Sequence, residues 1–255
     1  MVDFTFNRKI FKIREMAFTS IKNINPKKCD VIYLHSSDSE DLSGNKRVLA
    51  QMQYTLVNDL DIQTDELTAN IKKNCRYEIR RAEKEGAKVT VYDEYNTDII
   101  NSFEKTYNTM FVTKGLSLVF NRNLVTVGLH VGQLIITCCE IETYPNDVVY
   151  HAYLVDGKTV VLMYSASPLW DNNDKEKANC IGRMNKYLHY KDMEYFKNSG
   201  YSTYEWGGIG DPENPGGIDK FKAEFGGSVK KYCNYLIPKS LFGQLYVYLV
   251  KRRSE

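Results

Sequence analysis

The sequence predicts an α/β protein built around a mixed β-sheet. Segments with strand alternation and segments with helical periodicity follow one another along most of the chain. In the middle, three strand-like segments are joined by short turn-forming loops, which is typical of antiparallel strands. The 255 residues are 43% hydrophobic and 26% charged, a composition that can bury a substantial core in one large domain or two small ones.

In the first part of the chain, strand patterns bounded by turn formers occur over 30–35 and 51–60. A single helix is expected next, because Thr64 or Asp65 can cap its start and Gly86 can end it. A strand pattern then resumes. These elements give the order strand, helix, strand.

The second part begins with a helix over 97–112, whose apolar residues recur at helical spacing. The later elements are expected to be antiparallel strands over 134–142, 148–155 and 159–167, a helix over 179–199 with Asn179 as cap and Gly200 as stop, a strand over 202–208, a short helix over 217–225 and a strand over 229–237. The apolar run 124–139 alternates like strands, so no transmembrane helix is expected.

Charge and cysteine usage exclude several classes of function. A net charge of +2 gives no global attraction to nucleic acid, so DNA is not expected as a partner. The six cysteines have neither metal-ligand spacing nor CxxC pairs, which predicts no metal site and reduced thiols. Because the first residues lack the apolar core of a signal peptide, a cytoplasmic location is expected, with peripheral membrane contact left open.

A basic helix is predicted in KKNCRYEIRRAEKEG, where Lys73, Arg76, Arg80 and Lys84 fall on one face. This face is either solvated and balanced by the neighbouring glutamates, or a phosphate site. Forked guanidinium groups match phosphate oxygens, so the clustered arginines favour anion binding.

The predicted hairpin YHAYLVDGKTVVLMYSAS places His151 and Tyr153 on one face of a strand. His151 is either a hydrogen-bonded structural residue or part of a cleft. Tyr164 and Ser165 lie near the end of the second strand, where a ligand can approach the backbone.

Two polar stripes run along the predicted helix 179–199. One contains Arg183, and the other contains Asn185, His189 and Asp192. His189 is either a base or a packing residue, and the amides at the start of the helix could hold an anion.

The glycine-rich stretch YEWGGIGDPENPGGIDKFKAEFGG contains large apolar residues, which excludes a flexible linker. Glu205 ends a strand directly before Gly207 and Gly208, and these glycines allow a ligand or a neighbouring backbone to come close. Asp219 is expected to cap the following helical turn. Lys222 on that turn can stabilise a phosphate or a developing oxyanion.

The order of elements in the second part is that of the Gcn5-related N-acetyltransferase (GNAT) fold. The motifs RYEIRRAEKEG, MYSAS, NKYLHYKDMEYFKNSGY, YEWGGI and DKFKAEFGG together resemble the Fem-type branch of this superfamily, over about residues 50–235. The resemblance implies a GNAT-like acyltransferase fold with an abbreviated N-terminal half, 1–96, before a complete C-terminal half, 97–255.

The resemblance also implies transfer of an acyl group to a primary amine. It places Lys222 of FKxxFGG beside the reacting carbonyl, with Phe221 shaping the wall, and puts the arginines of the basic helix near the acceptor's phosphates. The chain lacks the QxxGxG-like turn of the members that bind acetyl-CoA, and it is shorter than the peptidyl transferases that use aminoacyl-tRNA.

The leading hypothesis is an N-acyltransferase that uses acyl-CoA and acts on a nucleotide-linked or lipid-linked amino sugar for bacterial surface polysaccharide. The alternatives are aminoacyl transfer from tRNA to a peptidoglycan precursor, and a catalytically silent module that binds a nucleotide-sugar. The candidate catalytic residues are Lys222 for the oxyanion, Glu205 as base, His151 or His189 as substitutes, and Tyr164 as acid. The candidate binding residues are Lys73, Arg76, Arg80, Arg81, Ser165, Arg183, Trp206, Gly207, Gly208 and Phe221.

Overall fold

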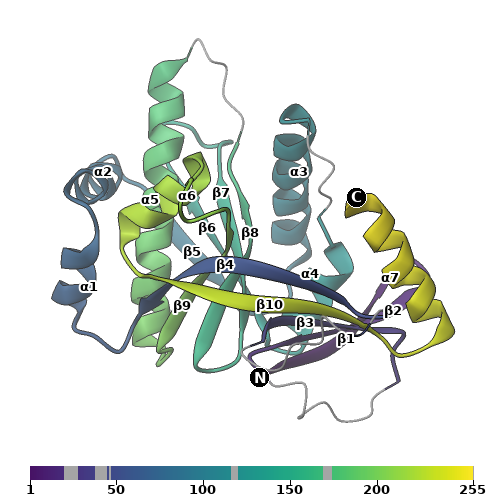
Figure 1. The fold of residues 1–255 in the computed structure, drawn as a ribbon. Helices are drawn as coiled ribbons and strands as arrows, with labels where there is room; N and C mark the ends of the chain where they lie inside the picture. Colours follow the sequence, from purple (N-terminus) through teal and green to yellow (C-terminus); the bar gives the residue numbers. More distant parts are fainter. Residues whose placement is uncertain (20–27, 38–44, 46, 116–119, 169–173, 255) are drawn as a thin grey trace.

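The computed structural model describes residues 1–19, 28–37, 45, 47–115, 120–168 and 174–254 (Figure 1). The strands are β1 (Val2–Arg8), β2 (Phe11–Ala17), β3 (Val31–Ser37), β4 (Leu49–Asp59), β5 (Lys88–Tyr92), β6 (Leu134–Glu140), β7 (Val149–Val155), β8 (Thr159–Ala166), β9 (Thr203–Ile209) and β10 (Ser228–Pro238). The helices are α1 (Thr64–Asn70), α2 (Lys73–Lys84), α3 (Thr97–Thr113), α4 (Arg122–His130), α5 (Lys175–Asn198), α6 (Gly217–Lys222) and α7 (Leu241–Ser254), and a 3-10 turn, η2 (Ala223–Phe225), follows α6.

All ten strands belong to one sheet with the order β1-β2-β3-β10-β4-β9-β8-β7-β6-β5. The pairs β2/β3 and β8/β9 are parallel, and the other neighbouring pairs are antiparallel. The expected α/β class with a mixed sheet is therefore confirmed. The last strand, β10, lies between β3 and β4, so the end of the chain joins strands from its beginning.

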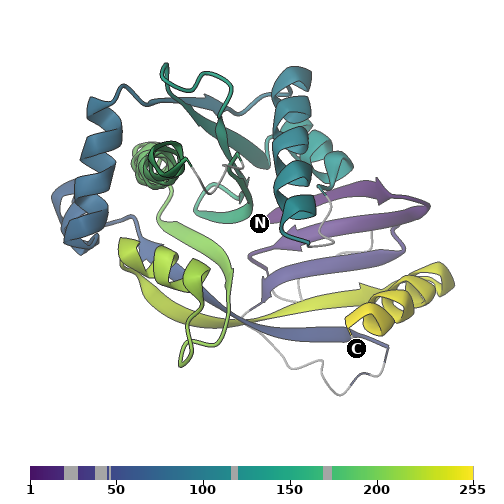
Figure 2. The ribbon, with the colours of Figure 1, turned by 90° about the horizontal axis from the view of Figure 1, so that it is seen from above.

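The two larger of three apolar clusters among the described residues cover the two faces of the sheet. Strand alternation sends Ala152 and Leu154 of β7 into the core that contains α3, α4 and α7, and sends Tyr153 and Val155 into the core that contains α1, α2 and α5. Figure 2 shows α3 and α5 on opposite sides of the strands that lie between them. We call these sides the α3 face and the α5 face.

The region expected to form one helix over 64–86 is two helices. The backbone is extended at Ile71 and Lys72, where α1 ends and α2 begins. The amide of Lys72 donates to the carbonyl of Glu224 (2.8 Å), so a contact with a distant segment holds this break. Gly86 follows α2 with φ +86°, as expected of a helix stop.

The prediction of strand throughout 124–139 is wrong for its first half, which is helix α4. The buried residues of α4 are Leu124, Val125, Gly128 and Leu129, a helical pattern that the alternation of valines obscured. A Cβ on Gly128 would lie 2.8 Å from Cβ of Leu134, so this glycine allows α4 to pack against β6.

Two helix starts also differ from expectation. Helix α5 begins at Lys175 with Asp174 as N-cap, whose carboxylate accepts from the amide of Lys177 (3.0 Å), and Asn179 lies inside it. Asp219 is not the N-cap of α6 but lies in its first turn, where it accepts from the amide of Gly216 (2.8 Å).

Among the described residues, no helix is both long and apolar enough to span a membrane.

Candidate active site

Strands β8 and β9 run parallel but pair only at their starts. Thr159–Val161 of β8 pair with Thr203–Glu205 of β9, and within the described residues the two strands do not pair beyond this point. The carboxyl ends of parallel strands lie at the same edge of the sheet, and unpaired backbone groups there can bind an extended ligand. The end of the β8/β9 pairing is therefore the candidate position of the site.

Gly207 and Gly208 lie directly beyond this point on β9. A Cβ on Gly207, which has φ +67°, would lie 2.7 Å from the carbonyl oxygen of Leu162. A Cβ on Gly208 would overlap the side chain of Gln53. We expected these glycines to allow close approach of either a ligand or a neighbouring part of the protein. In the structure, the protein's own atoms lie against both glycines.

Lys222 at the end of α6 is buried against the same part of β9. Its Nζ donates to the carbonyl oxygens of Trp206 (2.9 Å) and Gly208 (2.7 Å). Two of the three ammonium hydrogens are thus used, and no acceptor for the third is found among the described residues. Burial lowers the pKa of Lys222 to about 8, and the acids Asp219 and Glu205 oppose this shift.

Glu205 is buried on the α3 face. Tyr204 and Trp206, its neighbours along β9, belong to the core of the α5 face, and Val161, its partner on β8, belongs to the other core. Lys222 binds the carbonyls of Trp206 and Gly208, which follow Glu205 on β9, so both candidate residues lie at the end of the β8/β9 pairing. Their joint action stays a prediction.

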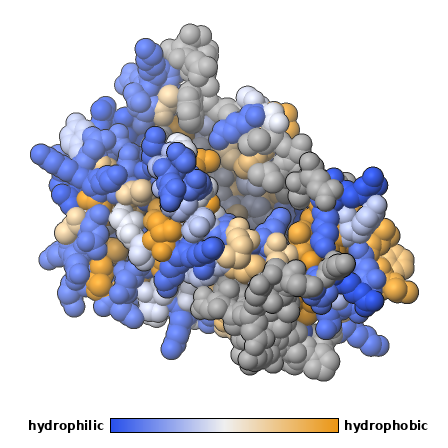
Figure 3. Space-filling model, viewed as in Figure 1, coloured by the Kyte–Doolittle hydropathy of each residue, from blue (hydrophilic) through white to orange (hydrophobic). Residues whose placement is uncertain are grey.

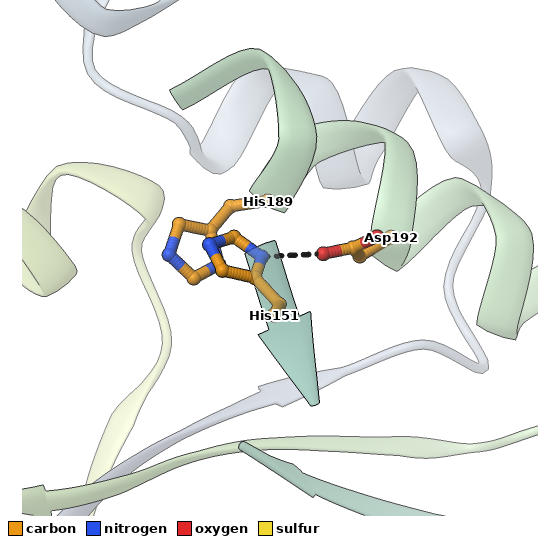
Figure 4. Close-up of side chains that lie close together, drawn as sticks. All are labelled: His151, His189 and Asp192. Atoms are coloured by element: carbon orange, nitrogen blue, oxygen red, sulfur yellow. Dashed lines mark hydrogen bonds and ion pairs between the residues drawn. The ribbon is translucent and has the colours of Figure 1, made fainter. Parts of the chain in front are cut away.

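A chain of hydrogen bonds fills the α5 face beside these residues. The carboxylate Oδ2 of Asp192 accepts from Nδ1 of His151 (2.7 Å) and from the hydroxyl of Tyr153 (2.5 Å). The hydroxyls of Tyr153 and Tyr204 are 2.7 Å apart, and Nδ1 of His189 lies 2.9 Å from the hydroxyl of Tyr204. Figure 4 shows the two histidines and the acid together, His151 from β7 and the other two from α5. We call the five hydrogen-bonded residues His151, Tyr153, His189, Asp192 and Tyr204 the histidine network.

His189 joins the histidine network to a wall of aromatic rings. Its ring stacks on His151 (3.9 Å between centroids) and lies 4.5 Å from Trp206 and 5.6 Å from Phe221. Burial lowers the pKa of His189 well below 6.5, and electrostatic interactions with His151 and Lys222 add to this effect. His189 is therefore neutral at neutral pH.

His151, His189 and Asp192 are residue types that bind metal ions, and their ligand atoms lie within 4.8 Å of one another. Both ring nitrogens of His151 already have partners, since Nε2 lies 2.8 Å from Oδ1 of Asn185. The bonded oxygen of Asp192 has two donors. We therefore assign these residues to a hydrogen-bonded network and not to a metal centre.

The sheet separates Tyr164 from the histidines. A bulge in β8 shifts the pairing opposite Ala152 and Tyr153, and Tyr164 packs on the α3 face against Tyr107 (5.2 Å) and Phe120 (5.1 Å). Tyr164 and His151 therefore lie on opposite faces of the sheet, and the role of Tyr164 as acid stays a prediction. Burial raises the pKa of its hydroxyl, and the charge of Glu15 raises it further.

Glu15 on β2 is a buried acid on the α3 face that the sequence analysis missed. Oε1 of Glu15 contacts Nε2 of His35, whose ring stacks on Tyr33 (4.0 Å), and Oε2 has no hydrogen-bond partner among the described residues. The signal was present, because Glu15 interrupts an apolar alternation of Phe11, Ile13 and Ala17.

Arg76, one of the predicted phosphate ligands, is engaged by the fold. Its Nη1 donates to the carbonyl oxygens of Thr68 (3.3 Å), Ala69 (2.9 Å) and Ile71 (2.9 Å) at the end of α1, where the Thr68 carbonyl also accepts from the amide of Ile71 (3.2 Å). Arg76, which belongs to α2, thus caps the C-terminal end of α1.

Two other predicted anion ligands share one acid. Arg81 donates to Oε1 of Glu85 (2.8 Å), and Arg183 forms a forked pair with both oxygens of Glu85 (2.8 and 2.9 Å). Lys73 and Arg80 are exposed on α2, which packs behind α5. A phosphate role for this helix stays a prediction, for which Lys73, Arg80 and Arg81 are exposed.

Ser165, on β8, lies opposite His151 of β7 in the strand pairing. It is partly exposed beyond the end of the β8/β9 pairing, so its role in binding also stays a prediction.

The lowered pKa of Lys222 makes a testable contribution to pH-dependent stability. Between pH 8 and 10.5 the unfolded chain holds a proton on this lysine that the folded protein has released, so the unfolding free energy rises with pH in this window. Relative to Lys222→Met, the wild type should gain up to about 3 kcal/mol across the window. Urea unfolding of both proteins at several pH values measures the difference, and a constant difference would show that the lysine is not buried as a cation.

No protein-family model matches the sequence, and no curated protein matches it. Solved structures do match the fold. FemX shares 16% sequence identity with a TM-score of 0.56, over 84% of this chain and 68% of FemX. The C-terminal domain of a putative lysylphosphatidylglycerol synthetase from Agrobacterium fabrum has 11% identity and a TM-score of 0.53, over 86% of this chain and 71% of that one.

L-PGS from Bacillus licheniformis also matches, with 13% identity and a TM-score of 0.51, over 87% of this chain and 72% of that one. Identities this low establish a shared fold and leave activity open. The expected Fem-type fold is thereby confirmed by the fold shared with FemX, and the division into halves at residue 96 stays a prediction.

Proposed function

We propose that the protein is a transferase that moves an acyl or aminoacyl group onto a primary amine. The observation that carries this proposal is Lys222, a buried lysine fixed by two backbone carbonyls where β8 and β9 stop pairing. The fold shared with FemX and with lysylphosphatidylglycerol synthetases supports the same class of reaction.

In the proposed reaction, the amine attacks the carbonyl carbon of a thioester or ester, and the carbonyl oxygen becomes an oxyanion. The remaining N–H of Lys222 would donate to this oxyanion, which a fixed cation in a buried site stabilises strongly. Glu205, the nearby buried acid, would take the proton from the amine. Collapse of the intermediate then expels the thiolate or alkoxide of the donor.

For the acceptor we propose the amine of a nucleotide-linked or lipid-linked amino sugar, with acyl-CoA as donor. The exposed Lys73 and Arg80 of α2 are the proposed phosphate contacts.

Aminoacyl-tRNA is the second candidate donor. The matches to FemX and to two lysylphosphatidylglycerol synthetase structures favour it, since the name of the latter describes transfer of a lysyl group to a lipid.

The donor test is an assay with purified protein, a panel of amino sugars linked to nucleoside diphosphates, and either acyl-CoA or charged tRNA. Turnover that requires acyl-CoA and survives ribonuclease is the expected result. Turnover that depends on charged tRNA and is lost with ribonuclease would replace the donor but keep the transferase. Thermal stabilisation by a nucleotide-sugar without turnover of any donor would favour the binding module instead.

A further inference from the structure

The C-terminal helix α7 and the turn between β1 and β2 together expose an apolar patch. Its residues, which we call the α7 patch, are Ile10, Leu241, Phe242, Leu245, Tyr248 and Leu249, and each is between 45% and 81% exposed. Figure 3 shows apolar surface at the right, over α7, bordered by hydrophilic residues. A continuous apolar patch on a protein surface marks a site of interaction.

Helical periodicity explains why α7 is apolar on two sides. Tyr246, Val247 and Val250 form one stripe, which packs into the core of the α3 face. The exposed apolar residues fall at spacings of three and four on the other stripe, where the fold gives them no cover.

The turn between β1 and β2 is held against α7, so the patch is one surface. The ring centroid of Phe11 lies 5.0 Å from that of Tyr246 and 6.4 Å from that of Phe242. In addition, Nη1 of Arg8 donates to the hydroxyl of Tyr246 (3.2 Å). Ile10, at the tip of the turn, is 75% exposed beside them.

The border of the α7 patch is basic. Segments 8–12 and 239–252 contain no Asp or Glu, and their basic residues are Arg8, Lys9, Lys12, Lys239, Lys251 and Arg252. The guanidinium of Arg252 lies 5.6 Å from the ring centroid of Tyr248. Asp30, the acid next to these segments, is engaged by the hydroxyl of Ser240 (2.6 Å) and the amide of Lys12 (2.9 Å).

We propose that the α7 patch docks the protein on the surface of a membrane that contains anionic lipid. Apolar and aromatic side chains of a helix lying in the interface enter the boundary of the acyl chains, and basic residues at its border attract anionic headgroups. The other stripe of α7 packs into the core of the α3 face, so the helix lies on the membrane with its exposed stripe towards the lipid. A second copy of the chain is disfavoured as occupant, because two basic borders would repel each other.

The test is co-sedimentation of the full chain with phosphatidylcholine vesicles, with and without phosphatidylglycerol. Binding is expected to vesicles with phosphatidylglycerol and to weaken as salt is raised from about 0.1 M to about 1 M. Equal affinity for both vesicles, or no binding to either, would overturn the proposal.

Matched variants test the apolar residues of the patch and its basic border separately. Leu245→Glu should lower the partition coefficient by at least about tenfold through loss of apolar insertion. Arg252→Glu should lower it about fivefold or more, only for vesicles with phosphatidylglycerol. Val112→Glu and Lys105→Glu, at exposed positions of α3, are the controls and should bind as the wild type does.

A further measurement tests whether a second copy of the chain occupies the α7 patch. Analytical ultracentrifugation is expected to show the same mass for the wild type and Leu245→Glu. A wild-type dimer that Leu245→Glu dissociates, together with no vesicle binding, would assign the patch to a second copy of the chain.

Discussion

Replacing Lys222 by methionine should lower kcat for transfer by about 10²- to 10³-fold, the effect of removing one donor to a developing oxyanion. The methionine keeps the length of the side chain but offers no N–H to the carbonyls of Trp206 and Gly208 or to the substrate. Because the contact to the oxyanion exists only in the transition state, KM should change much less than kcat. Steady-state kinetics with the donor and acceptor identified in the panel measure both constants.

The matched control for this variant is Lys220→Met, two residues earlier on α6, where the lysine is exposed. It should leave kcat within about twofold of the wild type, as surface changes away from a site do. Circular dichroism and urea unfolding must show that Lys222→Met is folded under assay conditions. A folded Lys222→Met protein that keeps wild-type kcat would remove Lys222 from the reaction and with it the main support for the proposed mechanism.

Local sequence signals predicted most elements of the C-terminal part because their periodicity and caps agree with the final contacts. Hairpin β7/β8 follows the Asp156-Gly157 turn, and α3 follows its apolar spacing. Local sequence signals failed where contacts between residues far apart in the sequence determine the structure. The break between α1 and α2 depends on Glu224, and the packing of α4 depends on Gly128 against Leu134.

The candidate site was predictable only in part for the same reason. Helical spacing placed His189 and Asp192 on one stripe, and strand alternation placed His151 with Tyr153, so most members of the histidine network were named. That these two sets meet, and that Tyr204 links Tyr153 to His189, depends on how α5 packs over β6, β7 and β9. Periodicity within one element carries no information about which elements become neighbours in space.

The histidine network should be among the most stabilising features of the fold. Asp192 is fully buried, and its Oδ2 accepts from both Tyr153 and His151 while Oδ1 has no hydrogen-bond partner among the described residues. Asp192→Ala leaves a buried hydroxyl and a buried imidazole N–H without their acceptor. We expect a loss of about 2–6 kcal/mol in the free energy of unfolding, because each of the two buried donors left without an acceptor costs about 1–3 kcal/mol.

Asp174→Ala on the same helix is the matched control for this loss. The carboxylate of Asp174 is exposed and caps α5 through one hydrogen bond to the amide of Lys177, so its removal should cost only about 1 kcal/mol. Asp192→Asn keeps the shape and one acceptor but turns an NH₂ group towards a donor, and should lie between the two at about 1–3 kcal/mol. Urea unfolding of the three variants gives this order. If Asp192→Ala cost no more than Asp174→Ala, the network would not hold α5 on the sheet, and the position of His189 beside Lys222 would need another cause.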